Sequence, residues 1–321
     1  MKFLIAGFGS IGRRHLRNLR TLGEQDILLY RTNQSTLPDD EIAGLVVETD
    51  LHAALEHRPD VVIVANPTAL HLTVAIPAAE AGCHLFLEKP VSHSLDGIGA
   101  LQNALKNTGK SALVGFQFRF HPGLRQIAAW INQGTIGRTL SARAHWGEYL
   151  PAWHPWEDYR ASYAARADLG GGVALTLCHP FDYLRWLLGE VVDVDGYCAR
   201  VSDLDLQVED LVEADLRFAS GARASVHLDY FQRPGAHTLQ INGTQGTIRW
   251  DNADGAAHLY RAVDEQWEHF TPPPEFERNI LFLEQTRHLI DIVQGKAQPA
   301  CTLLDGQRAL QIALAIKEKF L

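Results

Sequence analysis

Short apolar runs alternate with helical stretches through the first third of the chain. The run Asp-Val-Val-Ile-Val-Ala at residues 60–65 is continuous and β-branched, which is typical of a central parallel strand buried on both faces. Similar runs predict strands at residues 2–7, 26–30, 45–47, 84–87 and 111–115, with helices at 13–22, 50–56 and 95–106 between them. Six strands with interleaved helices predict an α/β fold with a doubly wound parallel sheet, a Rossmann domain that we expect over residues 1–120.

Beyond Pro122 the pattern changes to longer strands joined by short turns. Strand patterns cover residues 139–146, 191–201, 208–218, 222–230 and 238–241, and helices are predicted at 124–131, 172–188, 275–294 and 304–319. The turn signals Ser220-Gly221 and Asn242-Gly243 separate the later strands, which indicates a largely antiparallel sheet. The sequence therefore predicts a second domain of the α+β class, with an open sheet, over residues 121–321.

Composition and charge exclude several classes of protein. The 321 residues carry a formal net charge of −9, so the chain has no basic footprint for nucleic acid. No apolar run approaches membrane-spanning length, and residues 1–6 are too short a run for a signal peptide. We therefore expect a cytoplasmic protein with no membrane partner. The four cysteines lie far apart without zinc spacing, so we expect reduced core thiols and no metal site.

The segment Gly-Phe-Gly-Ser-Ile-Gly joins the first predicted strand to the first helix and matches the pattern GxGxxG. Gly7 permits the tight turn, Gly9 lets the backbone approach a pyrophosphate, and Gly12 allows the helix to pack closely on the strand. The phosphates would then lie at the positive end of the helix. We expect the cofactor site to include Gly7, Gly9, Ser10, Ile11 and Gly12.

The end of the second strand bears on the choice between NAD and NADP. Sites that prefer NAD usually carry a carboxylate there, whereas an arginine accommodates the 2′-phosphate of NADP. Residues 30–33 contain Arg31 and no carboxylate, so NADP is slightly favoured. The alternative is that Arg31 is a solvated loop residue whose guanidinium at most stacks on the adenine.

The fourth strand ends in a polar loop at the carboxyl edge of the sheet. Because ligands bind at this edge, we expect Asn66, Pro67, Thr68 and His71 to lie near the cofactor. For His71 a helix-capping or solvated position is an equal alternative.

The fifth strand delivers Glu88-Lys89-Pro90 to the same edge. Pro90 restricts the backbone of Lys89 to extended conformations, so the strand does not continue directly into a helix. The ammonium group of Lys89 is expected at the rim of a ligand cleft. The alternative is an exposed loop lysine, the usual position of charged residues.

In the second domain a triple glycine at residues 170–172 precedes a predicted helix that carries His179 and Asp182. These two residues are three apart, so they share one face of a helix. Pro180 would disturb the middle of that helix and is expected to produce a kink that aims His179. The alternative for His179 is a satisfied core histidine. The aromatic loop over residues 149–163, which ends at Tyr163, suits either a sugar site or a subunit interface.

Four motifs occur along the chain in a fixed order: GxGxxG at 7–12, Asn66-Pro67-Thr68 with His71, Glu88-Lys89-Pro90, and Gly-Phe-Gln-Phe-Arg-Phe-His-Pro at 115–122. This order resembles that of the Gfo/Idh/MocA oxidoreductases over essentially the whole chain. The Glu-Lys-Pro motif at this spacing is its most specific element. Members of the family usually carry asparagine where this chain has Gln117.

The resemblance implies hydride transfer between NAD(P) and a secondary alcohol or ketone of a sugar, inositol or nucleotide sugar. His179 is then the expected base, and Lys89 the expected cation on the reacting oxygen and a contact of the cofactor. Glu88 is expected to hold Lys89 or to contact the nicotinamide ribose. Further substrate contacts are expected at Gln117, Arg119 and Tyr163. The resemblance also implies a homo-oligomer, a dimer or a tetramer.

One departure from the family concerns the residues before His179. Relatives usually have an aspartate three or four positions earlier, where this chain has Leu175 and Thr176. Asp182 is the candidate substitute, with a catalytic role through His179. Two alternatives follow from the same family: a regulatory protein that senses NAD(P) without chemistry, and an NAD-dependent glycosidase.

Overall fold

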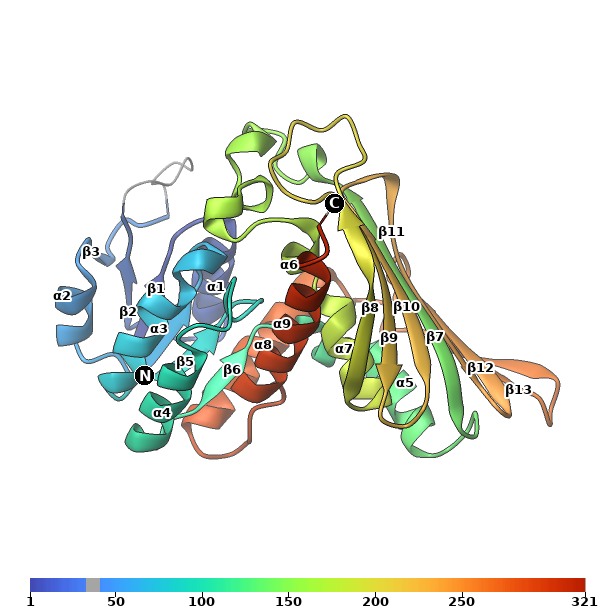
Figure 1. Ribbon diagram of the computed structural model, residues 1–321. Helices are drawn as coiled ribbons and strands as arrows, with labels where there is room; N and C mark the ends of the chain where they lie inside the picture. The colour runs from blue at the N-terminus through green and yellow to red at the C-terminus, as the bar shows by residue number, and fades with distance from the viewer. Residues whose placement is uncertain (33–40, 321) are drawn as a thin grey trace. The chain divides into compact units, whose positions relative to one another are not determined.

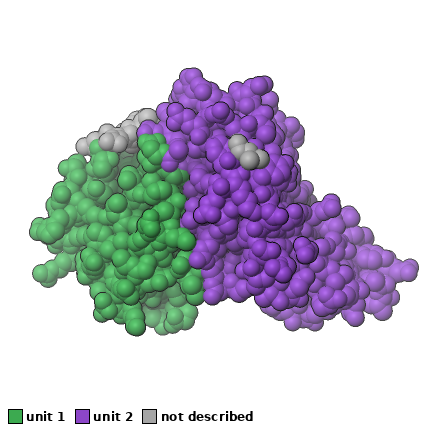
Figure 2. Space-filling view, in the orientation of Figure 1, with its two compact units in different colours: residues 1–117, 168–170, 278–307 green, residues 118–167, 171–277, 308–321 purple. Residues whose placement is uncertain are grey.

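The computed structural model describes residues 1–32 and 41–320. By its internal packing the chain divides into two compact units, coloured separately in Figure 2. Unit 1 comprises Met1–Gln117, Asp168–Gly170 and Arg278–Gln307, and unit 2 comprises Phe118–Ala167, Gly171–Glu277 and Arg308–Leu321. The domain boundary expected at residues 120 and 121 stays a prediction. Within the described ranges, no helix has the length and apolar character needed to span a membrane.

Unit 1 contains a six-stranded parallel sheet in the order β3-β2-β1-β4-β5-β6, which confirms the predicted Rossmann fold. The strands are β1 (Phe3–Ala6), β2 (Ile27–Tyr30), β3 (Val46–Glu48), β4 (Val61–Val64), β5 (His84–Leu87) and β6 (Ala112–Val114). Every residue of β1 and β4 is buried, as expected for strands at the centre of a parallel sheet. The carboxyl ends of all six strands therefore meet at one edge.

Among the described residues of unit 1, five α-helices accompany this sheet. They are α1 (Ser10–Thr21), α2 (Leu51–Glu56), α3 (His71–Glu80), α4 (Ile98–Thr108) and α8 (Arg278–Val293). Helix α8 packs on α1, where the guanidinium of Arg14 lies 4.4 Å from the ring centroid of Phe282. The expectation that α4 begins at Leu95 is wrong, because Gly97 lies before its first turn in a left-handed conformation with φ +82°.

Unit 2 contains an eight-stranded sheet in the order β14-β13-β12-β11-β7-β10-β9-β8. The strands are β7 (Thr139–Tyr149), β8 (Val191–Ala199), β9 (Leu211–Phe218), β10 (Arg223–Asp229), β11 (Phe231–Gly243), β12 (Gly246–Asp251), β13 (Ala257–Arg261) and β14 (Gln266–Phe270). All neighbouring strands are antiparallel except β7 and β10, which run parallel. The predicted α+β class with a largely antiparallel sheet is confirmed.

The two faces of this sheet differ in character. Helices α5 (Pro122–Asn132), α6 (Val173–Thr176) and α7 (His179–Leu188) pack on one face (Figure 1). In β10, Val226 and Leu228 are buried, whereas Ser225 and His227 are only half-buried. Because neighbouring residues of a strand point to opposite faces, Ser225 and His227 lie on the other side of the sheet. We call that side the polar face. Helix α9 (Leu303–Lys317) ends the chain's regular structure.

The single helix expected over residues 172–188 is wrong. The structure has two helices, α6 and α7, separated at Leu177 and Cys178. Pro180 lies in the first turn of α7, where its missing N–H would have no partner in any case and its fixed φ suits the helix. Pro180 therefore begins a helix instead of kinking one, and His179 is the first residue of α7.

Candidate functional site

The turn between β1 and α1 is possible only with glycine at two positions. Gly7 has φ +97°, and a Cβ there would lie 2.6 Å from the backbone nitrogen of Asn66. A Cβ on Gly12 would overlap the carbonyl oxygen of Gly7. The motif thus closes the turn and brings the helix against the strand, as the sequence predicts.

The start of α1 presents backbone N–H groups with no side chain bonded to them. Gly9 is the N-cap, no side chain of the described residues caps the helix, and its first turn holds no acidic residue. Ser10 is exposed, and a Cβ on Gly9 would meet no atom of the described residues within 4 Å. This open, positive helix end fits a phosphate group, so the turn fits the pyrophosphate of a dinucleotide.

Arg31 follows directly after β2 and is 7% exposed. Its backbone N–H donates to the carbonyl of Glu48 over 3.1 Å. The alternative that Arg31 is a solvated loop residue is therefore wrong. Residues 33–40, which follow, lie outside the described residues.

His71 joins two loops of the sheet edge. Its Nδ1 lies 2.9 Å from the carbonyl oxygen of Pro90, and its Nε2 lies 3.0 Å from that of Asn66. The side chain is buried, and burial lowers the pKa of His71 although the charge of Glu88 and these hydrogen bonds oppose the shift. A neutral imidazole donates to one carbonyl only. His71 is thus no solvated residue, and it fixes the loop after Lys89 to the loop after β4.

Asn66, Pro67 and Thr68 form the start of this edge loop. The amide nitrogen of Asn66 donates to the carbonyl of Leu70 over 2.9 Å. Thr68 is buried, and a Cβ on Gly170 would lie 2.9 Å from its Cβ. The first glycine of the triple-glycine segment therefore packs against this loop.

Glu88 is bound to helix α1. Its Oε1 lies 2.7 Å from Nε2 of His15, and both side chains are buried. Lys89 next to it is half-buried, and its peptide bond to Pro90 is cis. Gln117 is buried at the end of unit 1, and its backbone N–H donates to Gly115 over 3.1 Å. The contact with His15 was not predicted from the sequence, because 73 positions separate the partners.

In unit 2, Arg119 and Asp182 form a buried bidentate ion pair. Nε of Arg119 donates to Oδ2 of Asp182 over 3.0 Å and Nη2 donates to Oδ1 over 2.7 Å. The side chains are 7% and 1% exposed. Both residues were expected in the site, but as separate contacts. Any role of Asp182 toward His179, or of Arg119 toward a substrate, has to coexist with this pair.

His179 is buried among aromatic rings of its own unit. Phe118 approaches it edge-on with ring centroids 5.0 Å apart, and Trp146 lies 5.4 Å away at 33°. Trp146 in turn stacks on His237 at 4.3 Å. Leu175 and Thr176, which precede α7 by four and three positions, are buried, and the hydroxyl of the neighbouring Tyr230 donates to the carbonyl of Ala164 over 3.3 Å. The first turn of α7 is therefore held mainly by ring packing and by the Arg119 pair.

The remaining glycines explain why the segment before α6 needs them. A Cβ on Gly171 would overlap the carbonyl oxygen of Tyr163, and one on Gly172 would overlap the carboxylate of Glu209. Lys317 Nζ lies 3.0 Å from Oε2 of Glu209 and donates to the carbonyl of Gly171 over 3.0 Å. The segment thus passes close to the turn that carries Tyr163, whose side chain is 36% exposed.

Models of one protein family match both parts of the chain. The NAD-binding Rossmann fold of the oxidoreductase family matches residues 1–116, and the GFO/IDH/MocA C-terminal domain matches residues 124–249. The chain belongs to the Gfo/Idh/MocA oxidoreductase family. Unit 1 accordingly contains the NAD-binding fold of the family.

Individual relatives agree with this membership. Levoglucosan dehydrogenase of Pseudarthrobacter phenanthrenivorans is 31% identical over 231 residues, which are 64% of this chain and 56% of that protein. Myo-inositol 2-dehydrogenase of Thermotoga maritima is 27% identical over 99% of this chain and 96% of that protein. A solved levoglucosan dehydrogenase in complex with NADH has a TM-score of 0.88 at 22% identity, covering 99% of this chain and 96% of that chain. The last likeness shows the fold, and the first match spans little more than half of its relative.

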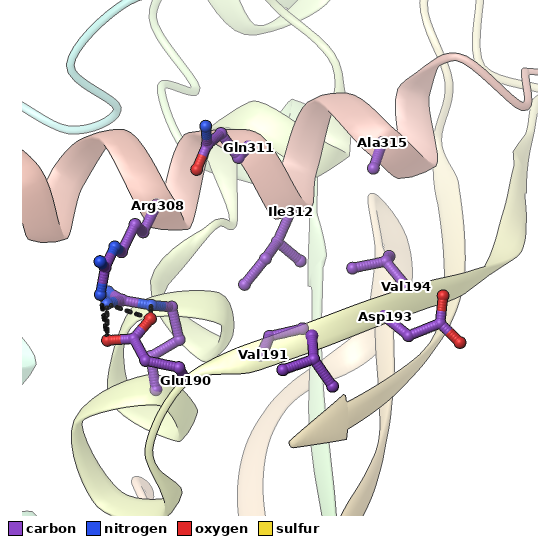
Figure 3. Close-up of a pocket in the computed structure, with 10 residues that line it drawn as sticks. Glu190, Val191, Asp193, Val194, Arg308, Gln311, Ile312 and Ala315 are labelled. Carbon is purple, nitrogen blue, oxygen red and sulfur yellow. Dashed lines mark hydrogen bonds and ion pairs between the residues drawn. The ribbon is translucent and has the colours of Figure 1, made fainter. Parts of the chain in front are cut away.

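This Gfo/Idh/MocA chain also has a cavity of about 510 Å³ beside the edge strand β8 (Figure 3). Arg185 and Arg308 both pair there with Glu190, at 2.8 and 2.5 Å. Partial burial opposes ionisation of Glu190, but the two guanidinium groups lower its pKa. The lining residues are Arg185, Glu190, Val191, Val192, Asp193, Val194, Arg308, Gln311, Ile312 and Ala315, which include none of the site residues expected from the sequence.

Proposed function

We propose that this protein transfers a hydride reversibly between NAD(P) and a secondary alcohol or ketone of a sugar, inositol or nucleotide sugar. The observation that supports this most is the uncapped end of α1 behind the Gly7–Gly12 turn, on the same sheet edge as the Glu88-Lys89 loop. In this proposal the dinucleotide site and the cation of Lys89 lie at one edge of the same sheet. The levoglucosan and myo-inositol dehydrogenases among the relatives support the class of substrate.

The chain supplies the two groups that alcohol oxidation needs. The hydroxyl proton must go to a base, and the charge that develops on oxygen needs a hydrogen-bond donor or cation. In this proposal the imidazole of His179 takes the proton and the ammonium of Lys89 donates to the oxygen. The bound dinucleotide supplies the nicotinamide ring that accepts or returns the hydride. Asp182 is proposed to orient the first turn of α7 through its pair with Arg119.

The other expected residues take supporting roles in the proposal. Glu88, anchored to His15, holds the backbone before Lys89 and lies near the nicotinamide ribose. The edge loop with Asn66, Pro67, Thr68 and His71 lines the cofactor site. Substrate contacts are assigned to Gln117, Arg119 and Tyr163.

The finer choice of cofactor rests on Arg31. A buried guanidinium after β2, with no carboxylate in residues 30–32, supports a slight preference for NADP. A homo-oligomer, dimer or tetramer, is proposed to form through the polar face of the eight-stranded sheet. The cytoplasmic location stays a prediction. The comparisons favour neither a regulatory nor a glycosidase function.

A fluorescence titration with NADH and with NADPH tests the cofactor half of this proposal. We expect saturable binding of both, tighter for NADPH, and a loss of that difference in Arg31→Ala. Failure of both nucleotides to bind, in protein shown to carry none already, would remove the redox function.

Turnover in a screen of sugars and inositols tests the chemical half. General acid–base groups typically contribute 100-fold or more, so Lys89→Ala and His179→Ala should each lower turnover about 100-fold or more. Both variants should still bind NADPH. The matched controls Lys106→Ala and His52→Ala change exposed residues of the same types and should keep full turnover. Unchanged turnover in either site variant removes that residue from the mechanism.

A further inference from the structure

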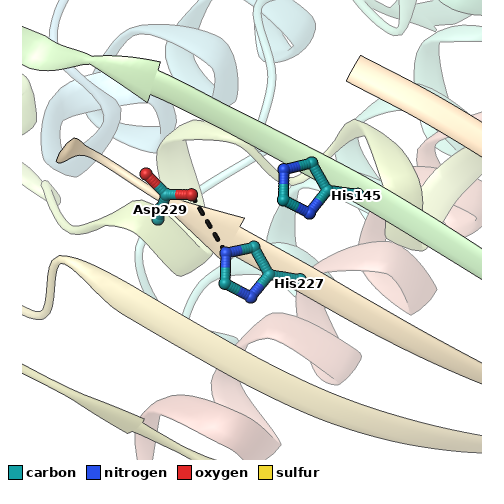
Figure 4. A group of neighbouring side chains, drawn as sticks. All are labelled: His145, His227 and Asp229. Carbon is teal, nitrogen blue, oxygen red and sulfur yellow. Dashed lines mark hydrogen bonds and ion pairs between the residues drawn. The ribbon is translucent and has the colours of Figure 1, made fainter. Parts of the chain in front are cut away.

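Two histidines and an aspartate meet on the polar face of the eight-stranded sheet, away from the residues used in the proposed reaction. His145 of β7 and His227 of β10 are direct partners in the parallel ladder. Their rings stack with centroids 4.6 Å apart and an angle of 1°. Asp229 follows two residues after His227, and one ligand atom from each of the three lies within 4.8 Å of the others (Figure 4).

The side-chain oxygen of Gln232 adds a fourth potential ligand atom to the cluster. Oε1 of Gln232 lies 2.6 Å from Nε2 of His145, and Nε2 of His227 lies 3.0 Å from Oδ2 of Asp229. Gly147 is the residue opposite Asp229 in the ladder, and a Cβ there would overlap both Gln232 Oε1 and Asp229 Oδ2. A side chain at position 147 would therefore fill the space in which these two oxygens gather.

Hydrogen bonds hold the outer atoms of two of the proposed ligands, His227 and Asp229. Nδ1 of His227 lies 2.6 Å from Oε1 of Glu213, which leaves Nε2 directed at the cluster. Oδ1 of Asp229 accepts from the backbone N–H groups of Phe231 and Gln232, at 2.9 and 2.7 Å, which leaves Oδ2 for a ligand. A carboxylate behind a histidine is the usual support of a metal-bound imidazole.

We propose that His145, His227 and Asp229 bind one divalent transition-metal ion, with Zn²⁺ as the best match, and that Gln232 or a water takes the fourth position. Two imidazole nitrogens with carboxylate and amide oxygens suit four-coordinate Zn²⁺. Asp229 and Glu213 together carry two negative charges, which balance the charge of the ion. Because the rings lie parallel, one imidazole has to turn to aim its nitrogen at the ion.

Such an ion would join three strands at the centre of the sheet. His145 belongs to β7, His227 and Asp229 to β10, and Gln232 to the start of β11. The proposed ligands include no cysteine and come from separate strands, which is why the cysteine spacing predicted no metal site. The proposal is independent of the redox function, since it concerns the stability of unit 2.

Zinc binding to the full-length protein, first stripped with a chelator, tests this site. We expect one Zn²⁺ per chain by titration against a chromophoric chelator, and a higher melting temperature with Zn²⁺ than without. His145→Ala and His227→Ala should each weaken binding by about tenfold or more and abolish the rise in melting temperature. His258→Ala removes a histidine of the same sheet whose Nδ1 lies 2.6 Å from Nδ1 of His269, and it should behave as the wild type.

Two results would overturn the proposal. One is the absence of stoichiometric binding in the wild type. The other is equal affinity in the wild type, His145→Ala and His227→Ala, which would mean an adventitious ion only. Circular dichroism without metal shows whether each variant is folded. If His227→Ala does not fold, the half-buried His145 decides the question alone.

Discussion

The two units build their candidate sites from different material. In unit 1 the dinucleotide turn consists of backbone and glycine: Gly7 turns the chain, Gly12 admits the helix, and free N–H groups face outward beyond Gly9. In unit 2 the first turn of α7 is held by side chains, through the Arg119–Asp182 pair and the rings around His179. The glycine turn tolerates no side chain at Gly7 or Gly12, but its backbone needs no side-chain partner. A side-chain site depends on every partner keeping its charge and position.

The largest expected effect is the loss of stability in Asp182→Leu, which tests the side-chain site of unit 2. Removing the carboxylate takes the bidentate partner away from the buried guanidinium of Arg119, which should lower the free energy of unfolding by about 3–5 kcal/mol, measured by urea denaturation. The double variant Arg119→Met/Asp182→Leu should recover most of that loss, because no buried charge remains.

The pair of Arg160 with Asp158 is the matched control for this test. It has the same forked geometry but lies exposed, so Asp158→Leu should leave the denaturation midpoint unchanged. A double variant as unstable as Asp182→Leu would show that the carboxylate does more than neutralise Arg119.

Low pH should destabilise unit 2, because one of its buried side chains, His121, can be protonated. Burial lowers the pKa of His121 from 6.5 to about 4, and its Nδ1 accepts from the N–H of Gly123 at the start of α5. His121 is harder to protonate in the folded protein than in the unfolded chain. Its contribution to the free energy of unfolding is therefore complete above pH 6.5 and is lost as the pH falls toward 4. At pH 5 the loss should be about 2 kcal/mol.

His121→Asn keeps a capping oxygen that does not titrate in this range, so its stability should fall less steeply between neutral pH and pH 5. Chemical denaturation at several pH values measures the slope. His52→Asn, at an exposed histidine, should keep the wild-type slope. Equal slopes in wild type and His121→Asn would mean that other groups govern acid sensitivity.

The smallest expected effect is a change in NADPH affinity, and it tests the glycine turn of unit 1. Gly9→Ala adds a methyl group where no described atom lies within 4 Å, so the fold should keep its melting temperature. The methyl group would point into the space proposed for the pyrophosphate, and NADPH affinity should fall about tenfold, or about 1.4 kcal/mol, by fluorescence titration. Gly99→Ala in α4 also meets no described atom within 4 Å. It should leave NADPH affinity unchanged and raise the melting temperature slightly, because alanine favours a helix more than glycine does. Unchanged affinity in Gly9→Ala would place the phosphates elsewhere.

Features set by neighbouring residues were predictable from the sequence. The β-branched run became the buried strand β4, the glycine turn leads into α1, and Ser220-Gly221 separates β9 from β10. Each depends on conformational preferences within a few positions. The helix expected over 172–188 failed for a related reason, because a proline is as suitable in the first turn of a helix as it is unsuitable in the middle. Periodicity alone does not tell these two positions apart.

Contacts between distant positions were not predictable. Arg119 and Asp182 are 63 positions apart, and His15 and Glu88 are 73 apart. In the sequence each of these polar residues has no recognisable partner nearby, and the partner is identified only in the folded structure. The family motifs located the candidate residues, but they did not show which of these residues form hydrogen bonds with one another.

Strand β7 has a consequence for how unit 2 folds. Its neighbours in the sheet are β10 and β11, and both lie far along the chain from it. A growing chain that has completed β7 at residue 149 must extend to residue 223 before the first partner strand begins. Pairing over such separations is slow and leaves strand edges open meanwhile. The centre of the sheet therefore cannot form until β10 and β11 are available, and a chain that ends before β10 carries β7 without either of its neighbouring strands.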